Sequence, residues 1–483
     1  MAKKTRSPHP QWALKHKIRG TELRNIKGRY YLYSVTSKYD PALKRSRKVT
    51  GKLLGTITEQ EGFVESEKRQ LQKSQRPMVD IDTICIRERG FTGFIETYSA
   101  EIIEKLKQFF PDEWKWVLYM AYCRLVHHSA IKNMPLFVAK SMLAEGNTFV
   151  LNDKTFSNAL RRIGTQRSQA TDYLKSFIKP GDHVMVDMTN IFSASEKMHY
   201  AKEGYNSDMI FDKQFNLMYI YSAKLLQPVF YRLYAGNIRE VTAFKMSLKE
   251  SGISEAVVIA DKGFYSLANV EMLGSEGIKF IIPLKRDNAL IQYDQIRDAA
   301  QRFKYNDRYI WYTAREENGL QIVGFRDDKL KVQEEKDYLD RTVTMPENYN
   351  EEGFHKRRHV FGTITIVTNT SFPADQIYTT YKSRNAVEVM FDGLKNVLAA
   401  DSSYMQNEDA LQGWMFVNHV ALQWYYIIYR MLYQAKQLSR YSVADFIKHL
   451  YEIKTVRING QWLPEPQIKA TLIMLEKLNI SIT

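Results

Sequence analysis

The sequence predicts an α/β protein of several domains, in which a β-rich segment interrupts the main α/β part. The length of 483 residues is about three times the ~150 residues typical of one domain. Residues 182–284 alternate apolar strand patterns with amphipathic helix patterns, which is typical of an α/β sheet. Residues 289–375 contain three further strand patterns before helical patterns resume. These observations define the fold class.

The composition is that of a globular protein without disulfide bonds. Hydrophobic residues make up 44% and charged residues 25% of the chain, which is ordinary for a folded protein. Cys85 and Cys123 are the only cysteines, which excludes a disulfide framework or a cysteine-rich zinc site. The basic first residues lack the apolar run of a secretory signal. Residues 414–432 approach transmembrane length but include four polar or charged side chains, so we expect a buried helix and no membrane partner.

Positive charge is concentrated at the start of the chain. The first 50 residues hold 14 Lys or Arg against two acidic residues, a net +12 of the chain's +15. Arg45, Arg47 and Lys48 are among these cations, and aromatic residues are interleaved with them. Cations release counterions from phosphates and aromatic rings stack on bases, so the pattern favours nucleic-acid binding. A solvated basic segment without a partner is the alternative.

The first third of the chain predicts a β-hairpin followed by helices. Residues 29–57 contain two strand patterns around a polar turn at Pro41, and we assign residues 1–78 to a basic arm with this hairpin. Residues 95–145 carry apolar side chains at helical spacing. We therefore assign residues 79–175 to a helical region.

Two predicted strands of the α/β part end in aspartate. Residues 176–288 predict three antiparallel strands, then helix, strand, helix and strand; MVDMTN contains Asp187 and VVIADKGF contains Asp261. Sites form at the carboxyl ends of strands in α/β sheets. Adjacent carboxylates repel each other unless a cation lies between them, and Mg²⁺ prefers such oxygen ligands. Either Asp could instead be a turn residue or a helix cap.

The remaining segments complete the domain assignment. Residues 289–375 are a β-rich insertion, residues 376–435 return to the α/β part, and residues 436–483 are predicted as a helical tail. Motifs of other enzyme classes are missing, since no GxxxxGK[ST], HExxH, paired CxxC or GxSxG occurs. Acidic residues are left as the candidates for catalysis.

A predicted helix over residues 381–398 carries one polar face. At about 100° per residue, Tyr381, Arg384, Glu388 and Lys395 share this face, and apolar residues occupy another. Glu388 is a candidate third metal ligand, and the two cations are candidates for holding phosphates. The alternative is a solvated face with a helical Arg–Glu pair.

This spacing resembles a known signature. Tyr381-x2-Arg384-x3-Glu388-x6-Lys395 is similar to the Y-(2)-R-(3)-E-(6)-K signature of one large subgroup of DDE transposases from bacterial insertion sequences.

The two aspartate segments extend the resemblance. Asp187 in DMTNIFSAS and Asp261 in ADKGFYS resemble the subgroup's first and second Asp motifs. The segment PVFYRLYAGNIRE resembles the stretch between them, and Lys262 stands where many relatives have Arg. The similarity spans roughly residues 150–435.

The resemblance implies a fold and an activity. It implies a ribonuclease H-like catalytic core (176–288 and 376–435), interrupted by the insertion and preceded by an N-terminal DNA-binding region that includes the helices of 79–175. It also implies an Mg²⁺-dependent endonuclease and strand transferase that carries out cut-and-paste transposition. The partners would be double-stranded DNA, as inverted-repeat ends and target, and a second copy of the chain in a homodimeric synaptic complex. The expected location is the bacterial cytoplasm, with the nucleoid.

The resemblance also implies roles for single residues. Asp187, Asp261 and Glu388 would hold two Mg²⁺ ions, with Mn²⁺ as a substitute. Phosphates near the DNA terminus would be held by Tyr381, Arg384 and Lys395. Trp311 in the insertion is a candidate for stacking on a flipped base, although a tryptophan in a strand is more often part of the core.

Two other functions remain open. A DNA-binding protein descended from a transposase would no longer cut DNA, and a metal-dependent nuclease would cut without joining. A strand-transfer assay separates these possibilities.

Overall fold

The computed structural model describes residues 9–40, 45–74, 84–193, 195–204, 212–384, 389, 391, 393–398 and 402–482. The chain divides into two compact units. The first comprises residues 1–84 with the turn 457–461, and the second comprises residues 85–456 and 462–483. Each unit has its own hydrophobic core.

The first unit is a four-stranded antiparallel sheet in the order β1-β2-β3-β4. A tight turn joins β1 to β2 at Lys27 and Gly28, both with positive φ, as hairpin turns of this length require. Ala13, Leu23 and Leu32 belong to its small core. Its elements are α1 (Gln11–Leu14), β1 (Thr21–Ile26), β2 (Arg29–Asp40), β3 (Arg45–Thr58), β4 (Gly62–Glu65) and α2 (Glu67–Ser74).

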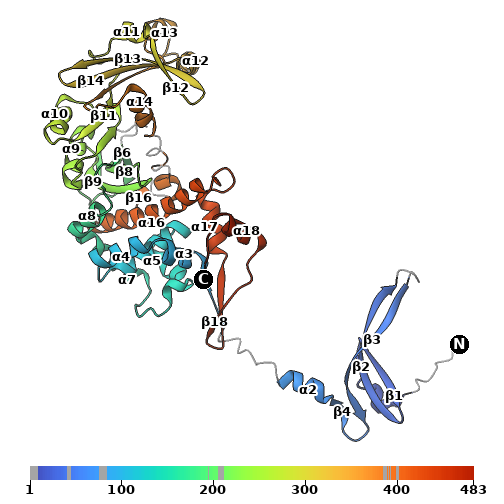
Figure 1. The fold of residues 1–483 in the computed structure, drawn as a ribbon. Coiled ribbons are helices and arrows are strands. Elements are labelled where there is room, and N and C mark those ends of the chain that lie inside the picture. The colour runs from blue at the N-terminus through green and yellow to red at the C-terminus, as the bar shows by residue number, and fades with distance from the viewer. Residues whose placement is uncertain are drawn as a thin grey trace. The chain divides into compact units, whose positions relative to one another are not determined.

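The second unit contains a large mixed sheet (Figure 1). At its centre β10 runs parallel to β6 and β11 runs parallel to β10, whereas β8 is antiparallel to β6 and β9 to β8. β10 is fully buried, as its continuously apolar sequence predicts. The elements of this part are β6 (His183–Ser193), β7 (Lys202–Glu203), β8 (Lys213–Ser222), β9 (Gln227–Ala235), α9 (Glu240–Ser251), β10 (Val257–Ala260), η4 (Lys262–Phe264), α10 (Leu267–Ser275), β11 (Lys279–Pro283) and β16 (Ser402–Ser403).

The strands of residues 289–375 continue this sheet. β15 pairs antiparallel with both β11 and β14, so β14, β13 and β12 extend the sheet beyond β11. Tyr378 of α14 packs against Phe303, Tyr305 and Phe325 on one face of the extension. The elements are α11 (Tyr293–Arg297), β12 (Gln301–Tyr305), β13 (Arg308–Glu317), β14 (Leu320–Asp327), α12 (Asp328–Thr344), α13 (Glu351–Arg357), β15 (Thr363–Thr368) and α14 (Ala374–Lys382).

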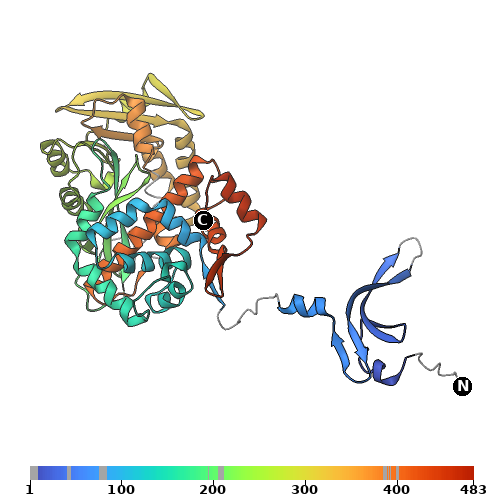
Figure 2. The same cartoon turned by 60° about the horizontal axis from the view of Figure 1, so that its bottom comes forward.

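Helices that precede the large sheet in the sequence and helices that follow it pack together around α16 (Figure 2). Two glycines allow α7 and α16 to approach closely, because a Cβ on Gly164 would lie 1.7 Å from the Asp409 carbonyl oxygen and one on Gly413 would lie 2.1 Å from that of Leu160. The elements are α3 (Gly90–Tyr98), α4 (Ala100–Phe109), α5 (Trp114–His127), η2 (Ile131–Asn133), α6 (Met134–Ala139), η3 (Met142–Ala144), α7 (Asp153–Thr165), α8 (Arg167–Lys175), α16 (Glu408–Gln434) and α17 (Val443–Tyr451).

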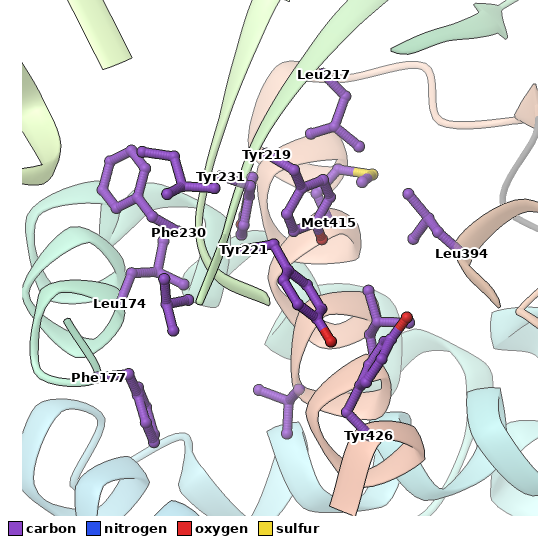
Figure 3. Close-up of a cluster of buried hydrophobic side chains, with 14 of the residues drawn as sticks. Leu174, Phe177, Leu217, Tyr219, Tyr221, Phe230, Tyr231, Leu394, Met415 and Tyr426 are labelled. Atoms are coloured by element: carbon purple, nitrogen blue, oxygen red, sulfur yellow. The ribbon is translucent and has the colours of Figure 1, made fainter. Parts of the chain in front are cut away.

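The main core lies between the sheet and α16 (Figure 3). The Tyr221 ring of β8 meets Tyr426 of α16 edge-on at 5.5 Å, and Tyr219 stacks on His419 at 5.8 Å. Burial lowers the pKa of His419 to about 3, so this imidazole is neutral at physiological pH. The aromatic side chains therefore fix α16 against β8.

α16 is the buried helix that the sequence predicts over residues 414–432. Its polar residues Gln423 and Asn418 are fully buried and hydrogen-bonded to Tyr173 and Arg124, respectively. No helix in the described part of the chain is long and apolar enough to span a bilayer.

The tail differs from the helices predicted for residues 436–483. Besides α17 and α18 (Lys469–Lys477), it contains β17 (Lys454–Ile458) and β18 (Gln461–Pro464), which form a sheet with β5 (Cys85–Glu88). The turn residues Asn459 and Gly460 both have positive φ, as in a two-residue hairpin turn. The prediction of a helical tail is therefore incomplete.

The predicted continuous helix over residues 381–398 is wrong for the described residues. α14 already ends at Lys382, and Arg384 lies in the turn that follows. The Ser383 hydroxyl donates to the Thr380 carbonyl, which is one way in which serine competes with helix continuation. Residues Gly393–Val397 form a short π-helix, an element that often occurs at functional sites.

Candidate active site

Asp187 lies where the parallel pairing between β6 and β10 ends. The last paired residues are Val186 of β6 and Ala260 of β10, so Asp187 and Asp261 follow at the same level on neighbouring strands. The Asp187 side chain is 20% exposed and accepts a hydrogen bond of 2.9 Å from the Met188 backbone amide. The parallel register therefore brings the two predicted carboxylates side by side.

Asp261 occupies the N-cap position of η4, but its side chain makes no capping hydrogen bond. A helix cap was the alternative explanation for this residue. The carboxylate is instead 35% exposed and faces Arg384. It is thus available for binding in a way that a capping side chain is not.

The guanidinium of Arg384 bridges both carboxylates. Its Nη1 lies 3.1 Å from Asp187 Oδ2, and its Nη2 lies 3.9 Å from Asp261 Oδ1. The Arg384 side chain is 14% exposed. One organic cation therefore stands between the two carboxylates, which is the position that their mutual repulsion favours for positive charge.

The electrostatics of Asp187 reflect this crowding. Burial raises the pKa of Asp187 to about 6, and the negative charges of Asp261 and Glu240 act in the same direction. The Arg384 charge and the Met188 amide oppose this rise. Asp187 is therefore a carboxylate that any additional cation nearby would stabilise.

Glu240 is a third carboxylate of this site that sequence reasoning missed. It is the first residue of α9 and is exposed. Partial desolvation and the charge of Asp261 raise its pKa, whereas Lys285 lowers it. A Cβ on Gly263 would lie 2.3 Å from Glu240 Oε2, so the absence of a side chain at Gly263 admits the carboxylate. The sequence feature that could have indicated Glu240 is its position three residues after Asn237, at the end of the segment PVFYRLYAGNIRE.

The other members of the predicted polar face are not all placed. Glu388 lies outside the described residues. Tyr381 is half-buried and packs against the main core, and Lys395 is half-buried within the π-helix. Of this face, the described residues bring only Arg384 onto the two aspartates.

A buried arginine holds the end of the π-helical segment. Arg124 donates to the Leu398 carbonyl, to Asn418 Oδ1 at 2.9 Å and to the Ser129 carbonyl at 3.1 Å. Its guanidinium also stacks on the Trp414 ring at 4.4 Å. The segment that carries Lys395 is thereby fixed to α5 and α16.

Trp311 lies on the face of the sheet extension opposite to Tyr378. It is half-buried and not part of the main core. Arg302 and Arg326 are its cross-strand neighbours, with guanidinium carbons 5.0 and 5.3 Å from the ring centroid. An indole between two cations is chemically suited to contact bases and phosphates.

In the first unit, Arg45, Arg47 and Lys48 are exposed residues of β3. Lys48 Nζ lies 3.1 Å from Glu22 Oε1, whereas Arg45 and Arg47 make no ion pair with any residue that the structure describes.

The donor set suits a hard cation. No three His, Cys, Asp or Glu side chains cluster closely enough for a metal site within the described ranges. Asp187 and Asp261 nevertheless offer converging carboxylate oxygens around one positive charge. These are the ligands that Mg²⁺ and Mn²⁺ prefer.

Comparison with known proteins identifies a family and a similar solved structure. The model of the family described as "Transposase DDE domain" matches residues 178–424, about half of the chain. The cryo-EM structure of a piggyBac transposase synaptic complex with hairpin DNA is similar, with 11% sequence identity, a TM-score of 0.42, and coverage of 75% of this chain and 79% of that chain. No curated protein matches.

Proposed function

Because the chain belongs to the transposase DDE domain family, we propose that it is the transposase of a bacterial insertion sequence. It binds the terminal inverted repeats, cuts the DNA at the ends of the element and joins those ends to target DNA. The observation that carries this proposal is the pair Asp187 and Asp261, which lie side by side where the parallel pairing of β6 and β10 ends. β6 itself continues past Asp187 to Ser193, so only β10 ends at its aspartate as predicted.

The strand order supports a ribonuclease H-like core. Three antiparallel strands, β9, β8 and β6, are followed by β10 and β11 parallel to β6, with helices in the connections. Such an order places the first strand in the centre and the two aspartates beside each other. The proposed catalytic domain comprises residues 176–288 and 376–435.

The proposed cofactor is a pair of Mg²⁺ ions, with Mn²⁺ as a substitute. Asp187 and Asp261 would hold them together with Glu388. When bound, the ions supply Lewis-acid stabilisation of the charge that develops during phosphoryl transfer. The raised pKa of Asp187 fits this role, because a buried carboxylate beside another carboxylate is stabilised by nearby positive charge.

The reaction proposed for the DNA consists of two in-line displacements. Water attacks the phosphorus at the end of the element, and the departing 3′ oxygen becomes a hydroxyl. That hydroxyl then attacks a phosphorus of the target, and the target strand's own 3′ oxygen leaves. Arg384, Lys395 and Tyr381 would position phosphates for these steps, since guanidinium and ammonium groups bind phosphate oxygens.

Duplex DNA is the proposed partner of the remaining parts. The exposed cations of the first unit, including Arg45 and Arg47, would contact phosphates or bases. Trp311 would stack on a base displaced from the helix. We also propose that residues 79–175 contribute to DNA binding and that two copies act together on paired ends.

The test is end cleavage by carboxylate variants. Asp187→Asn, Asp261→Asn and Glu388→Gln should each abolish cleavage without destabilising the fold or weakening end binding, because an amide keeps the shape but is a poor Mg²⁺ ligand. Asp153→Asn on the exposed start of α7 is the matched control. A variant of the three that cuts at the wild-type rate would remove its residue from the proposed site.

A further inference from the structure

We propose that residues 35–40 and 45–50 of the first unit form a ribbon that enters the major groove of duplex DNA and contacts base edges through Lys38, Arg45 and Arg47. The inference deepens the proposed function and rests on it, since DNA is the partner in both. It adds the groove, the face of the ribbon and the residues that make the contact.

The ribbon is a two-stranded extension of the first unit (Figure 1). β1 pairs with β2 only as far as Ser34, and β4 pairs with β3 only at residues 55–58. β2 and β3 continue as a pair from Val35 and Thr50 to Asp40 and Arg45. Neither outer edge of this extension is covered by another strand of the described residues. An isolated two-stranded ribbon is only marginally stable in water, so a partner that covers it stabilises it.

The register separates the ribbon's cations onto two faces. Lys38 is directly opposite Arg47, and Arg45, whose register partner is Asp40, lies two residues before Arg47, so these three cations share one face. Lys48 is opposite Ser37 and belongs to the other face. We call the face of Lys38, Arg45 and Arg47 the basic face.

The two faces differ in their partners. Lys48 Nζ lies 3.1 Å from Glu22 Oε1, and the Thr50 hydroxyl lies 3.1 Å from Glu22 Oε2. The basic face has no ion pair among the described residues, and all three of its cations are exposed. Lys48 therefore braces the ribbon against β1, whereas the basic face is left for a polyanion.

The basic face also carries the means to read bases. Arg45 and Arg47 can each donate two hydrogen bonds to one guanine edge. Val49, opposite Thr36 on the same face, is 41% exposed and presents methyl groups of the kind that contact thymine methyls.

The dimensions select the major groove of DNA. Paired strands lie about 4.8 Å apart, and the major groove of B-DNA, about 12 Å wide, admits a two-stranded ribbon. The deep major groove of A-form RNA is too narrow for one. A ribbon of six residues per strand extends about 20 Å, which is enough to follow the groove across several base pairs.

The test uses the full-length chain carrying Asp187→Asn, so that cutting does not disturb the binding measurement. The probe is a duplex of about 30 bp, three helical turns, selected on this protein from a random library. It is compared with the same duplex in which cytosines are replaced by glucosylated 5-hydroxymethylcytosine, which fills the major groove. Netropsin on the unmodified duplex blocks the minor groove for comparison.

Two triple variants isolate the basic face. Lys38→Gln/Arg45→Gln/Arg47→Gln removes its cations, and Lys15→Gln/Lys17→Gln/Arg19→Gln removes three exposed cations elsewhere in the same unit. We expect glucosylation of the duplex and the first triple variant each to weaken binding about tenfold or more. The first variant should bind the glucosylated duplex no more weakly than it binds the plain duplex. The control variant should lose only the electrostatic part of its affinity, seen as a smaller slope of log K against log[salt]. Its binding should still be weakened by glucosylation of the duplex.

Two results would overturn the inference. One is equal binding of plain and glucosylated duplexes by the parent chain. The other is an equal loss in the two triple variants, which would leave only bulk charge as the cause. A chain that binds through the basic face but, with Asp187 intact, neither cuts nor joins DNA would contradict the proposed function and leave the ribbon inference standing.

Discussion

The positively charged guanidinium of Arg384 lies between the carboxylates of Asp187 and Asp261. A guanidinium 3.1 Å from one carboxylate and 3.9 Å from the other satisfies both partly. A metal ion bound to the same oxygens would have to displace it or share them. The arginine that the family resemblance assigns to a DNA phosphate is thus, without DNA, a partner of the carboxylates.

Removing this guanidinium should strengthen metal binding in the absence of DNA. Arg384→Ala takes away the competing cation, and an ion pair of ~1 kcal/mol corresponds to about fivefold tighter Mn²⁺ binding, measured by calorimetry. Arg239→Ala, which removes an exposed cation next to Glu240, should leave the Mn²⁺ affinity within about twofold. Equal affinities in wild type and Arg384→Ala would show that the bridge does not compete.

The raised pKa of Asp187 predicts a pH-dependent cost to stability. Because the folded pKa of about 6 lies above the unfolded value near 3.8, the folded state binds the extra proton between these values, so stability falls as the pH rises from about 4 to 6. In metal-free protein, Asp187→Asn should therefore be more stable than wild type at pH 7, by about 1–3 kcal/mol. Denaturant unfolding at pH 4 and pH 7 measures this, and the difference should vanish at the lower pH. A wild type that matches Asp187→Asn at pH 7 would contradict the prediction.

Glu240 and Gly263 are predicted to act as one unit. A Cβ on Gly263 meets only the end of the flexible Glu240 side chain, so Gly263→Ala should displace that carboxylate with little loss of stability. Loss of the negative charge should raise the Mg²⁺ concentration for half-maximal cleavage a few-fold in Gly263→Ala and in Glu240→Ala alike. The double variant should be no worse than either single variant. Additive effects would show that the two residues act separately.

At the scale of elements, runs of apolar residues predict most strands of the large sheet. β10 is short, continuously apolar and buried, and the end of β6–β10 pairing sets Asp187 beside Asp261. The hairpin turn at Asn459-Gly460 could also have been predicted, because Asn-Gly between strand patterns is a strong signal for a tight turn. The prediction of a helical tail overlooked it.

Other features were not accessible from the sequence. The end of α14 at Lys382 and the π-helix depend on tertiary packing, which helical periodicity does not show. The direction of the Arg384 side chain depends on the turn after α14. Glu240 lies 21 residues before Asp261, and only the fold of α9 over η4 brings it near.

Arg124 tests how the π-helical segment is held. Arg124→Met should cost about 3 kcal/mol, because it leaves the Leu398 and Ser129 carbonyls and Asn418 without this donor in a buried site. Arg430→Met, which removes a donor to one carbonyl, that of Leu225, is the matched control and should cost less. Denaturant unfolding measures both, and equal costs would show that Arg124 is not a special anchor.

At the scale of the whole molecule, most of the net positive charge and the two candidate catalytic aspartates lie in different units. The first 50 residues hold a net +12 of the chain's +15, and Asp187 and Asp261 lie in the second unit. Deleting residues 1–50 should therefore weaken DNA binding and flatten its salt dependence, by about 0.9 in the slope of log K against log[salt] for each phosphate that the shortened chain no longer neutralises. A slope that is unchanged by the deletion would contradict the DNA-binding role of the arm.

The central claim is that this chain both cuts DNA and joins the new ends, with Asp187 and Asp261 in the reaction. A strand-transfer assay tests it most directly, with pre-cleaved duplexes carrying the element's ends, a target plasmid and Mg²⁺. We predict joined products with wild type and with the control Asp153→Asn, and none with Asp187→Asn or Asp261→Asn. Binding without cutting or joining would identify a DNA-binding descendant, and cutting without joining would identify a nuclease. Either result, or joining by Asp187→Asn at the wild-type rate, would contradict the claim.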